Sequence, residues 1–249
     1  MELKKFKLLD NIFGFVVFVI SAFVYLSTIE PTVSFWDCGE FIASSYKLEI
    51  GHPPGNPVFQ LIARFFTLFG DKDSAAMLIN AMSGLMSALT ITFLFWTITH
   101  LSRRIFEKNR KNGEENTFSI PNVITIIGAG LVGALAYSFS DTFWFSAVEA
   151  EVYAMSSLFT AVVFWAMLKW EEQADEPWSN RWIILISFLM GLSIGVHLLN
   201  LLTIPALVFI YYYKKYDVTR KGIFYVLLIS ALILGVVLFG VIPYLPKIA

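Results

Sequence analysis

Cysteine, charge and histidine are all scarce in this chain of 249 residues. Cys38 is the single cysteine, which excludes a disulfide within the chain and disfavours a structural zinc site. Charged residues make up only 15% of the sequence and hydrophobic residues 57%, with a mean hydropathy of +0.69. A soluble domain of this length does not bury so much apolar surface, so the composition indicates an integral membrane protein.

Signals for a nucleotide or nucleic-acid partner are weak. The sequence has no P-loop, and its net charge of −1 gives no electrostatic reason to bind nucleic acid. The partners that the composition does support are the lipid bilayer and a substrate that reaches the protein there.

The apolar segments predict an all-α polytopic membrane protein. A spanning helix needs roughly 20 apolar residues, and about seven segments approach that length. They are 12–29, 75–101, 122–140, 148–169, 182–196, 198–213 and 223–242. The fifth and sixth are short and separated only by His197, so hydropathy leaves open a tight hairpin or one broken helix.

Both ends of the chain need interpretation. The start, MELKKFKLLD, is basic and leads into an apolar run, as a signal peptide does. The run 12–29 is long for a signal sequence, and no small-residue cleavage site clearly ends it, so we interpret it as a retained first helix. The chain stops soon after the last span, and we expect residues 1–249 to be the N-terminal part of a longer protein.

The distribution of basic residues predicts the orientation in the membrane. With the N-terminus in the cytoplasm, most of the 18 Lys and Arg residues lie on the cytoplasmic side, and only Lys47, Arg64, Lys72 and Lys247 lie on the other. Residues 30–74, the junction 138–151 and the turn at His197 then share the external face. The polar chemistry of the sequence is concentrated in these three segments.

The first external loop, 30–74, has the periodicity of helices that lie along the membrane surface. Its apolar residues recur at three- and four-residue spacing, which predicts interfacial helices at roughly 37–49 and 57–69. The sequence Gly-His-Pro-Pro-Gly-Asn-Pro at 51–57 separates them, because consecutive prolines stop a helix and the glycines permit a sharp turn.

Asp37 and Glu40 are the leading carboxylates of this loop. Spaced three apart, they share one face of a helix, where Asp37 could act as a general base. The alternative is structural: Asp37 caps the helix that follows and Glu40 completes a capping box. The spacing alone does not separate the two interpretations.

Other polar residues of the external face also have two interpretations. His52 could bind a phosphate or a sugar hydroxyl, or simply occupy a turn; Arg64 could hold an anionic head group, or extend along the interface. Glu149 and Glu151 lie at the start of a membrane helix, where the positive end of the helix dipole stabilises a carboxylate. Carboxylates at that depth are nonetheless costly to bury and are often functional. His197 could be a packing residue, or it could contact a lipid phosphate together with Asn200 one helical turn away. We select both, with Tyr153, as substrate-binding candidates on this face.

No residue pattern predicts a metal site. The histidines are isolated, and a divalent cation would have to be held by Asp37, Glu149 or Glu151. No other cofactor is implied.

Four blocks of sequence carry a family resemblance. EPTVSFWDCGEF, GHPPGNPVF, EAEVYAM and GLSIGVHLLNL resemble a membrane family of Bacteroidetes that is related to the eukaryotic transmembrane protein O-mannosyltransferase, within the GT-C superfamily of glycosyltransferases. The resemblance extends from Glu30 to Leu201. It implies a seven-helix GT-C-like module in residues 1–249, with 30–74 as the external catalytic loop. It also implies a bacterial inner membrane location with a periplasmic active site.

The resemblance further implies an activity and its residues. A sugar, with mannose suggested by the eukaryotic relative, would pass with inversion from a polyprenyl-phosphate donor to Ser or Thr of an exported protein, or to another envelope acceptor. Asp37 would be the base. His52, Arg64 and His197 would stabilise the leaving phosphate, and Glu149 and Glu151 would position the acceptor or the sugar.

Two other functions remain open at this point. A transporter or flippase for a lipid-linked substrate predicts ionisable groups near the bilayer midplane, whereas here they cluster at one face. A non-catalytic subunit of an envelope complex would retain the same loop, so the sequence does not distinguish it from an enzyme.

Overall fold

The computed structural model describes residues 1–108 and 118–248, and these residues form helices without a β-strand. The long helices are α1 (Leu3–Ser27), α4 (Ala75–Lys108), α5 (Ile120–Ser138), α7 (Val152–Gln173) and α10 (Arg220–Val236). The shorter ones are α2 (Cys38–Lys47), α3 (Pro57–Thr67), α6 (Asp141–Ala147), α8 (Asn180–Ile194), the 3₁₀-helix η1 (Leu198–Thr203), α9 (Ile204–Lys215), the π-helix η2 (Val237–Val241) and α11 (Ile242–Ile248). The predicted all-α fold is therefore confirmed.

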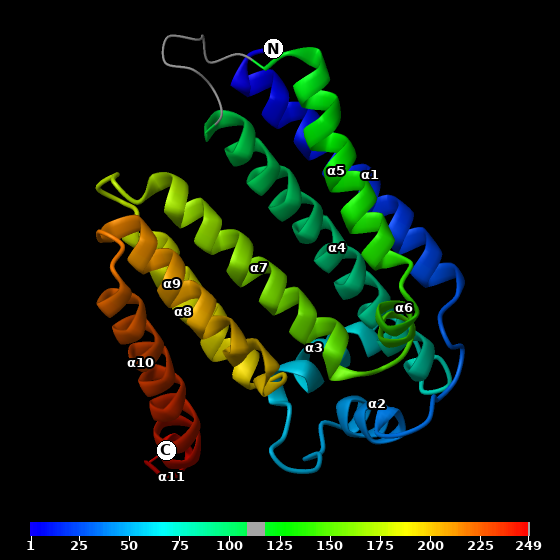
Figure 1. The fold of residues 1–249 in the computed structure, drawn as a ribbon. Coiled ribbons are helices and arrows are strands. Elements are labelled where there is room, and N and C mark those ends of the chain that lie inside the picture. The colour runs from blue at the N-terminus through cyan, green and yellow to red at the C-terminus, as the bar shows by residue number, and fades with distance from the viewer. Residues whose placement is uncertain (109–117, 249) are drawn as a thin grey trace.

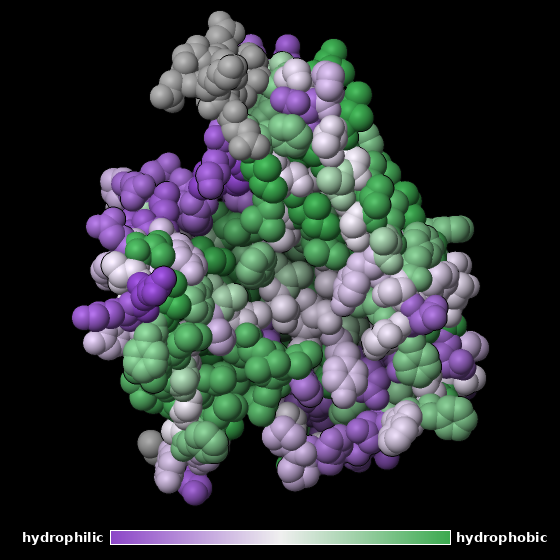
Figure 2. Space-filling model, viewed as in Figure 1, coloured by the Kyte–Doolittle hydropathy of each residue, from purple (hydrophilic) through white to green (hydrophobic). Residues whose placement is uncertain are grey.

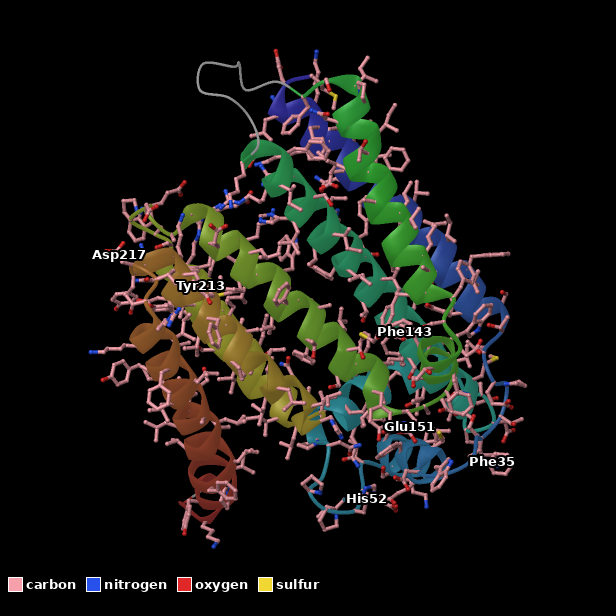
Figure 3. All side chains as sticks on the ribbon, viewed as in Figure 1. Phe35, His52, Phe143, Glu151, Tyr213 and Asp217 are labelled. Carbon is pink, nitrogen blue, oxygen red and sulfur yellow. The ribbon has the colours of Figure 1, made fainter. Side chains whose placement is uncertain are left out.

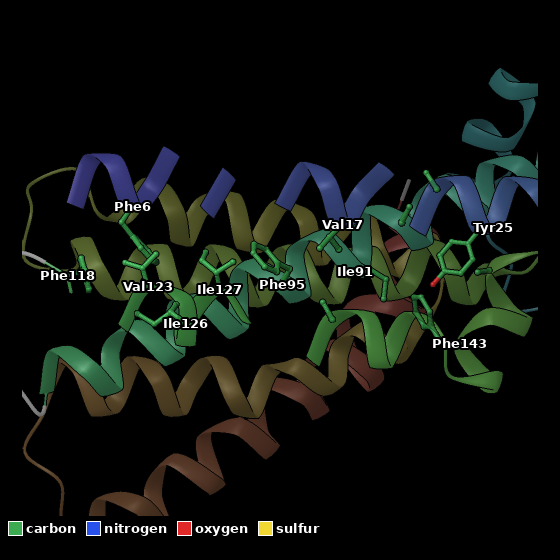
Figure 4. Packing of buried hydrophobic residues seen from close by; sticks show 14 residues of the cluster. Phe6, Val17, Tyr25, Ile91, Phe95, Phe118, Val123, Ile126, Ile127 and Phe143 are labelled. Atoms are coloured by element: carbon green, nitrogen blue, oxygen red, sulfur yellow. The ribbon is translucent and has the colours of Figure 1, made fainter. Parts of the chain in front are cut away.

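Helix α4 is the centre of the bundle and packs against α1, α5 and α7 (Figure 1). A core of buried apolar side chains lines the contact of α1, α4 and α5, with Phe95 and Ile126 fully buried (Figure 4). A second core joins α7 to α8 and α9 around Trp170. Helix α10 packs on α9 at the edge of the bundle.

Two glycine spacings in the sequence lie within helices and serve packing. The G-x-G-x-x-G at 128–133 is inside α5, where a Cβ on Gly130 would lie 2.5 Å from Thr99 Cγ2 of α4. The G-x-S-x-G at 191–195 ends α8, and its Ser193 is 1% exposed and donates to the Met190 carbonyl. Neither has the strand-to-helix setting in which such motifs bind nucleotides or present a nucleophile.

Within residues 1–108 and 118–248, five helical segments are long and apolar enough to cross a membrane. They comprise α1, α4, α5, α7 and the continuous stretch Arg220–Tyr244. The predicted spans 182–196 and 198–213 correspond to α8 and to η1 with α9, and both are shorter than the five candidate spans. The chain reverses between them, because Gly195 after α8 contacts α3, whereas Lys215 at the end of α9 returns to Ala174, which precedes α8. The broken-helix alternative is therefore wrong. Two helices are longer than the predicted spans, because polar residues continue the helix beyond its apolar part. Helix α1 begins at Leu3, not at residue 12, and α4 extends to Lys108, not to residue 101.

The segments predicted to share one face lie together at one end of the bundle. Helices α2, α3 and α6, the start of α7 and the turn before η1 gather there (Figure 1), and His52 and Glu151 lie at that end in Figure 3. Asp217 lies at the opposite end. Hydrophilic residues occur at both ends of the view in Figure 2, with a hydrophobic zone between them, as expected for a membrane-spanning bundle.

The predicted interfacial helices also form. The segments 37–49 and 57–69 correspond to α2 and α3, and the strong amphipathicity of α3 buries Phe59 and Ala63 against the bundle. The short helix α6 was not predicted, since seven residues carry too little periodicity to be read within the junction 138–151.

Candidate functional site

A cavity of about 370 Å³ lies where the loop between α2 and α3 meets the start of α7 and the turn after α8. This volume is within the range of small-molecule sites, about 300–1,000 Å³. The wall is formed by Asp37, Phe41, His52, Pro54, Gly55, Asn56, Glu151, Val152, Tyr153, Ile194, Val196, His197 and Leu198. Five residues predicted from the sequence are among them: Asp37, His52, Glu151, Tyr153 and His197.

Asp37 precedes α2 but does not cap it. Its backbone has φ −79° and ψ −5°, its side chain makes no cap hydrogen bond, and only its carbonyl oxygen accepts a bond, from the Phe41 N–H. The capping-box alternative is therefore wrong. The preceding residue, Trp36, has φ 64°, a left-handed backbone conformation that residues other than glycine seldom adopt. The carboxylate thus makes no hydrogen bond with α2 and stands at the half-exposed rim of the cavity.

Glu40 holds the His52 loop in place. Its Oε1 accepts the His52 backbone N–H at 2.5 Å, and its Oε2 lies 3.1 Å from His52 Nδ1. These hydrogen bonds hold the pKa of the Glu40 carboxyl below its usual value. The other ring nitrogen of His52, Nε2, lies 4.0 Å from Asp37 Oδ2. Glu40 therefore positions a ring that lines the cavity, and does not line it itself.

Glu151 is the buried carboxyl of the cavity. It is 8% exposed, its Oε1 accepts from the Cys38 thiol at 3.6 Å, and burial raises its pKa. Burial and the Glu151 charge also raise the pKa of Cys38 to about 12, so this thiol stays protonated and inert. Glu149 is equally buried, with a pKa raised by burial, but it lies outside the cavity wall.

His197 faces the cavity as a neutral ring. Its Nδ1 accepts the Leu199 N–H at 3.1 Å, so the ring proton belongs on Nε2, and burial lowers its pKa. The Tyr153 ring packs edge-on against it with centroids 5.4 Å apart. The two residues together offer donors to a bound oxygen atom.

Two predicted residues are occupied elsewhere. Arg64 donates to Thr67 Oγ1 at 3.0 Å and lies over the Tyr46 ring, away from the cavity. Asn200 is fully buried and joins α7 to α8, because it accepts from Thr160 and donates to Ser193 Oγ at 2.9 Å. The structure gives both residues local packing partners and does not bring them into the cavity.

One polar wall residue, Asn56, was not predicted. It precedes α3, a position where an Asn usually caps a helix, and that ordinary role gives no functional signal in a sequence. Its place in the wall depends on the docking of α3, whose Val58 N–H donates to the Gly195 carbonyl at 2.8 Å.

Within residues 1–108 and 118–248, no group of three or more His, Cys, Asp or Glu side chains is arranged to hold a metal ion. Asp37, Glu149 and Glu151, the ligands that a divalent cation would have needed, do not form such a group in this part of the chain.

Comparison with known proteins shows the family to which the chain is related. A family model for the N-terminal domain of protein O-mannosyl-transferase TMEM260 matches residues 37–220, a range that begins at Asp37 and includes every other cavity residue. The mouse protein O-mannosyl-transferase TMEM260 is 26% identical over 178 residues, which cover 72% of this chain and 22% of the relative. The Dictyostelium discoideum protein of the same name is 24% identical over 149 residues, covering 59% of this chain and 16% of the relative. No solved structure matches.

Proposed function

The chain belongs to the family of the protein O-mannosyl-transferase TMEM260 N-terminal domain, and on this basis we propose that it is the membrane module of an inverting glycosyltransferase. The chain spans about a fifth of the length of the curated relatives it matches, so the activity is proposed for the protein that contains this module. The sugar, by the name of those relatives, is mannose, and the acceptor is Ser or Thr of an exported protein. The donor is a polyprenyl-phosphate-linked sugar dissolved in the bilayer.

The observation that carries the proposal is the cavity at one end of the bundle. A membrane-dissolved donor presents its head group at the end of the spanning helices, which is where the cavity lies. Its wall contains the carboxylate of Asp37, which lies 4.0 Å from His52 Nε2, and also His197 from a separate element. A general base and hydrogen-bond donors within one cavity are what glycosyl transfer to a hydroxyl requires.

In the proposed reaction, Asp37 accepts the proton of the acceptor hydroxyl. The hydroxyl oxygen attacks C1 of the sugar from the face opposite the phosphate, and the new C1–O bond forms with inversion. The old C1–O bond breaks, and its electron pair stays on the phosphate oxygen of the lipid carrier. No further reactant is needed.

The two histidines have distinct roles in this step. His197 donates from Nε2 to the developing phosphate charge, because its Nδ1 is occupied by the Leu199 N–H. His52, held by Glu40, orders the rim beside Asp37. Arg64, directed elsewhere, takes no part.

We place the module in a bacterial inner membrane with the cavity in the periplasm. The positive-inside distribution of Lys and Arg supports this orientation, since the cavity lies at the end of the bundle opposite the basic loops. The module is residues 1–249, and its catalytic loop is 30–74.

The test is Asp37→Asn in the full-length protein, with exported proteins of the host analysed by mass spectrometry for hexose on Ser and Thr. The variant is expected to insert and fold normally and to lose at least about 100-fold in transfer, since general-base catalysis contributes about 10²–10⁴-fold. The matched control is Asp73→Asn, an exposed aspartate on the same loop, which should transfer at the wild-type rate.

Two outcomes overturn the proposal. Wild-type glycosylation by Asp37→Asn removes Asp37 as the base. Movement of the lipid-linked donor across vesicles by the purified protein, without sugar transfer, identifies a transporter instead.

A further inference from the structure

A second hollow lies along the spanning helices, next to the cavity. It has a volume of about 620 Å³ and is lined by α5 and α7, by α4, on which both of these helices pack, and by η1. Figure 2 shows the surface hollowed in its hydrophobic middle zone. Three wall residues, Tyr137, Leu199 and Leu202, are 46%, 45% and 66% exposed. This hollow, the α5–α7 groove, therefore opens to the side of the bundle, where the bilayer lies.

The wall of the α5–α7 groove suits an apolar chain. None of the described residues that line it is charged. Three of its threonines already donate their hydroxyl protons within the protein: Thr90 to the Met86 carbonyl, Thr160 to Asn200 Oδ1 and Thr203 to the Asn200 carbonyl. A sugar or a phosphate loses free energy where it finds few polar partners, whereas a hydrocarbon chain needs none.

The groove begins where the cavity ends. On α7, Tyr153 lines the cavity, and Ser157, one turn farther along, lines the groove. In the segment after α8, Leu198 lines the cavity and Leu199 lines the groove. His197, which binds the leaving phosphate in the proposed reaction, directly precedes this segment. Because the lipid chain of the donor is bonded to that phosphate, it leaves the cavity beside His197.

Another apolar groove competes for the same chain. It lies between α8, α9 and α10, has a volume of about 590 Å³ and shares Ile194 with the cavity wall. This α8–α10 groove reaches α7 at Met167, which is 14 residues, or about 21 Å of helix, beyond Tyr153. A chain that starts at His197 therefore meets the α5–α7 groove first.

We propose that the α5–α7 groove binds the polyprenyl chain of the donor. The proposal rests on the glycosyltransferase function above and adds the binding site of the lipid to it. Gly133, Ser157 and Ala161 are small residues of the groove wall, and they leave room for the methyl branches of an isoprenoid. The lipid enters from the bilayer through the open side of the groove and carries its phosphate to His197.

The first experiment locates the chain by photocrosslinking to the wild-type, full-length protein in phospholipid vesicles. The probe is a mannosyl-phosphoryl polyprenol with a diazirine in its second isoprene unit, and the crosslinked peptides are identified by mass spectrometry. We expect crosslinks within 90–98 of α4 and 157–164 of α7. Excess unlabelled polyprenyl phosphate should abolish them, and excess phospholipid should not.

Two results of the crosslinking overturn the proposal. Crosslinks confined to 183–191 and 229–241 place the chain in the α8–α10 groove. Crosslinks that phospholipid removes as well as polyprenyl phosphate does show that an ordinary bilayer lipid occupies the α5–α7 groove.

The second experiment fills each groove in turn. Ala161→Trp places an indole in the α5–α7 groove. The matched control, Gly191→Trp, places one in the α8–α10 groove, where an added Cβ meets open space. The measurement is the ratio of kcat/KM for a long-chain donor to that for a donor with one isoprene unit, which is too short to extend along the groove.

The ratio should fall in only one of the two variants. Lipid tails are as apolar as the groove wall, so the groove contributes fit and we expect a modest preference for the long donor, about tenfold in wild type. Ala161→Trp should abolish that preference, and Gly191→Trp should keep it. An unchanged ratio in Ala161→Trp overturns the proposal, as does a ratio that falls equally in both variants.

The crosslinking also separates this proposal from the proposed function. Wild-type protein that crosslinks the probe in the α5–α7 groove but transfers no sugar overturns the glycosyltransferase function and supports the lipid site. If Ala161→Trp does not fold, the crosslinking of the wild-type protein decides the proposal alone.

Discussion

The carboxylates around the cavity differ in what surrounds them, and this difference sets their chemistry. The Asp37 side chain is half exposed and makes no cap hydrogen bond with α2. Glu40 accepts hydrogen bonds from the His52 loop, and Glu151 is buried beside Cys38. A proton acceptor needs access to the acceptor hydroxyl, which favours Asp37. The two glutamates serve best in positioning the rim and the wall.

The buried carboxyl predicts a pH dependence of stability. Because burial raises the folded-state pKa of Glu151 above its ordinary 4.5, the folded protein holds this proton more tightly than the unfolded chain. Below pH 4.5 both states are protonated and the group has no effect. As the pH rises from 4.5 through the raised pKa, the folded protein loses stability.

Glu151→Gln should remove that loss. The melting temperature of the variant should exceed that of wild type by an amount that grows from pH 4 to neutral pH and then levels off; each kcal/mol corresponds to about 2–4 °C for a chain of this size. The control is Glu49→Gln, at an exposed side chain. A difference between Glu151→Gln and wild type that is constant with pH would contradict the assignment.

Among the helices, the docking of α3 against the turn after α8 gives the cavity its shape. The Val58 N–H donates to the Gly195 carbonyl, and a Cβ on Gly195 would lie 2.6 Å from Val58 Cγ2. Only glycine permits this approach without displacing a β-branched side chain. The loop that carries His52 and Asn56 depends on it.

Gly195→Ala should therefore move α3 and disturb the site. We expect a loss of about 1–3 kcal/mol in the free energy of unfolding, as for other overpacked contacts, together with reduced transfer. Gly191→Ala, within helix α8 and with open space around the added Cβ, should instead leave stability equal or raise it. Equal melting temperatures of the two variants would show that the approach is not tight.

Across the whole molecule, the two ends of the bundle have different tasks. The end opposite the cavity contains a network of ion pairs in which Arg103 of α4 bonds Glu107 and Glu172, the latter from α7. Arg103 is 7% exposed, so its charge needs those partners. This network ties α4 to α7 far from the cavity.

Glu172→Gln should weaken the fold and spare the site. The pairs of Glu172 with Arg103 and Lys169 are lost while Glu107 remains beside Arg103, so we expect about 1–3 kcal/mol of destabilisation with an unchanged KM for the donor. Glu176→Gln, at an exposed residue just beyond α7, should stay within about 0.5 kcal/mol of wild type. A raised KM in Glu172→Gln would reveal coupling between the two ends.

Much of the architecture was predictable because lipid imposes simple rules. Long apolar runs must become helices, since the bilayer offers no other partner for backbone groups, and the loop 30–74 displays helical periodicity that α2 and α3 confirm. Charge distribution alone brought Asp37, Glu151 and His197 to one face. Short elements such as α6 carry too little pattern to be predicted.

The individual roles were decided by three-dimensional contacts. The sequence left Asp37 with two interpretations, helix cap or base, and the structure shows that its side chain makes no cap hydrogen bond. Arg64 binds Thr67 one turn away in the same helix, and Asn200 binds Ser193 of α8. The burial of the Asn56 amide without a hydrogen-bond partner could not be predicted from the sequence, because it is a property of the packed chain. Hydrophobic periodicity is local and can be read residue by residue, whereas the satisfaction of a polar group depends on neighbours far apart in sequence, and folding alone brings those together.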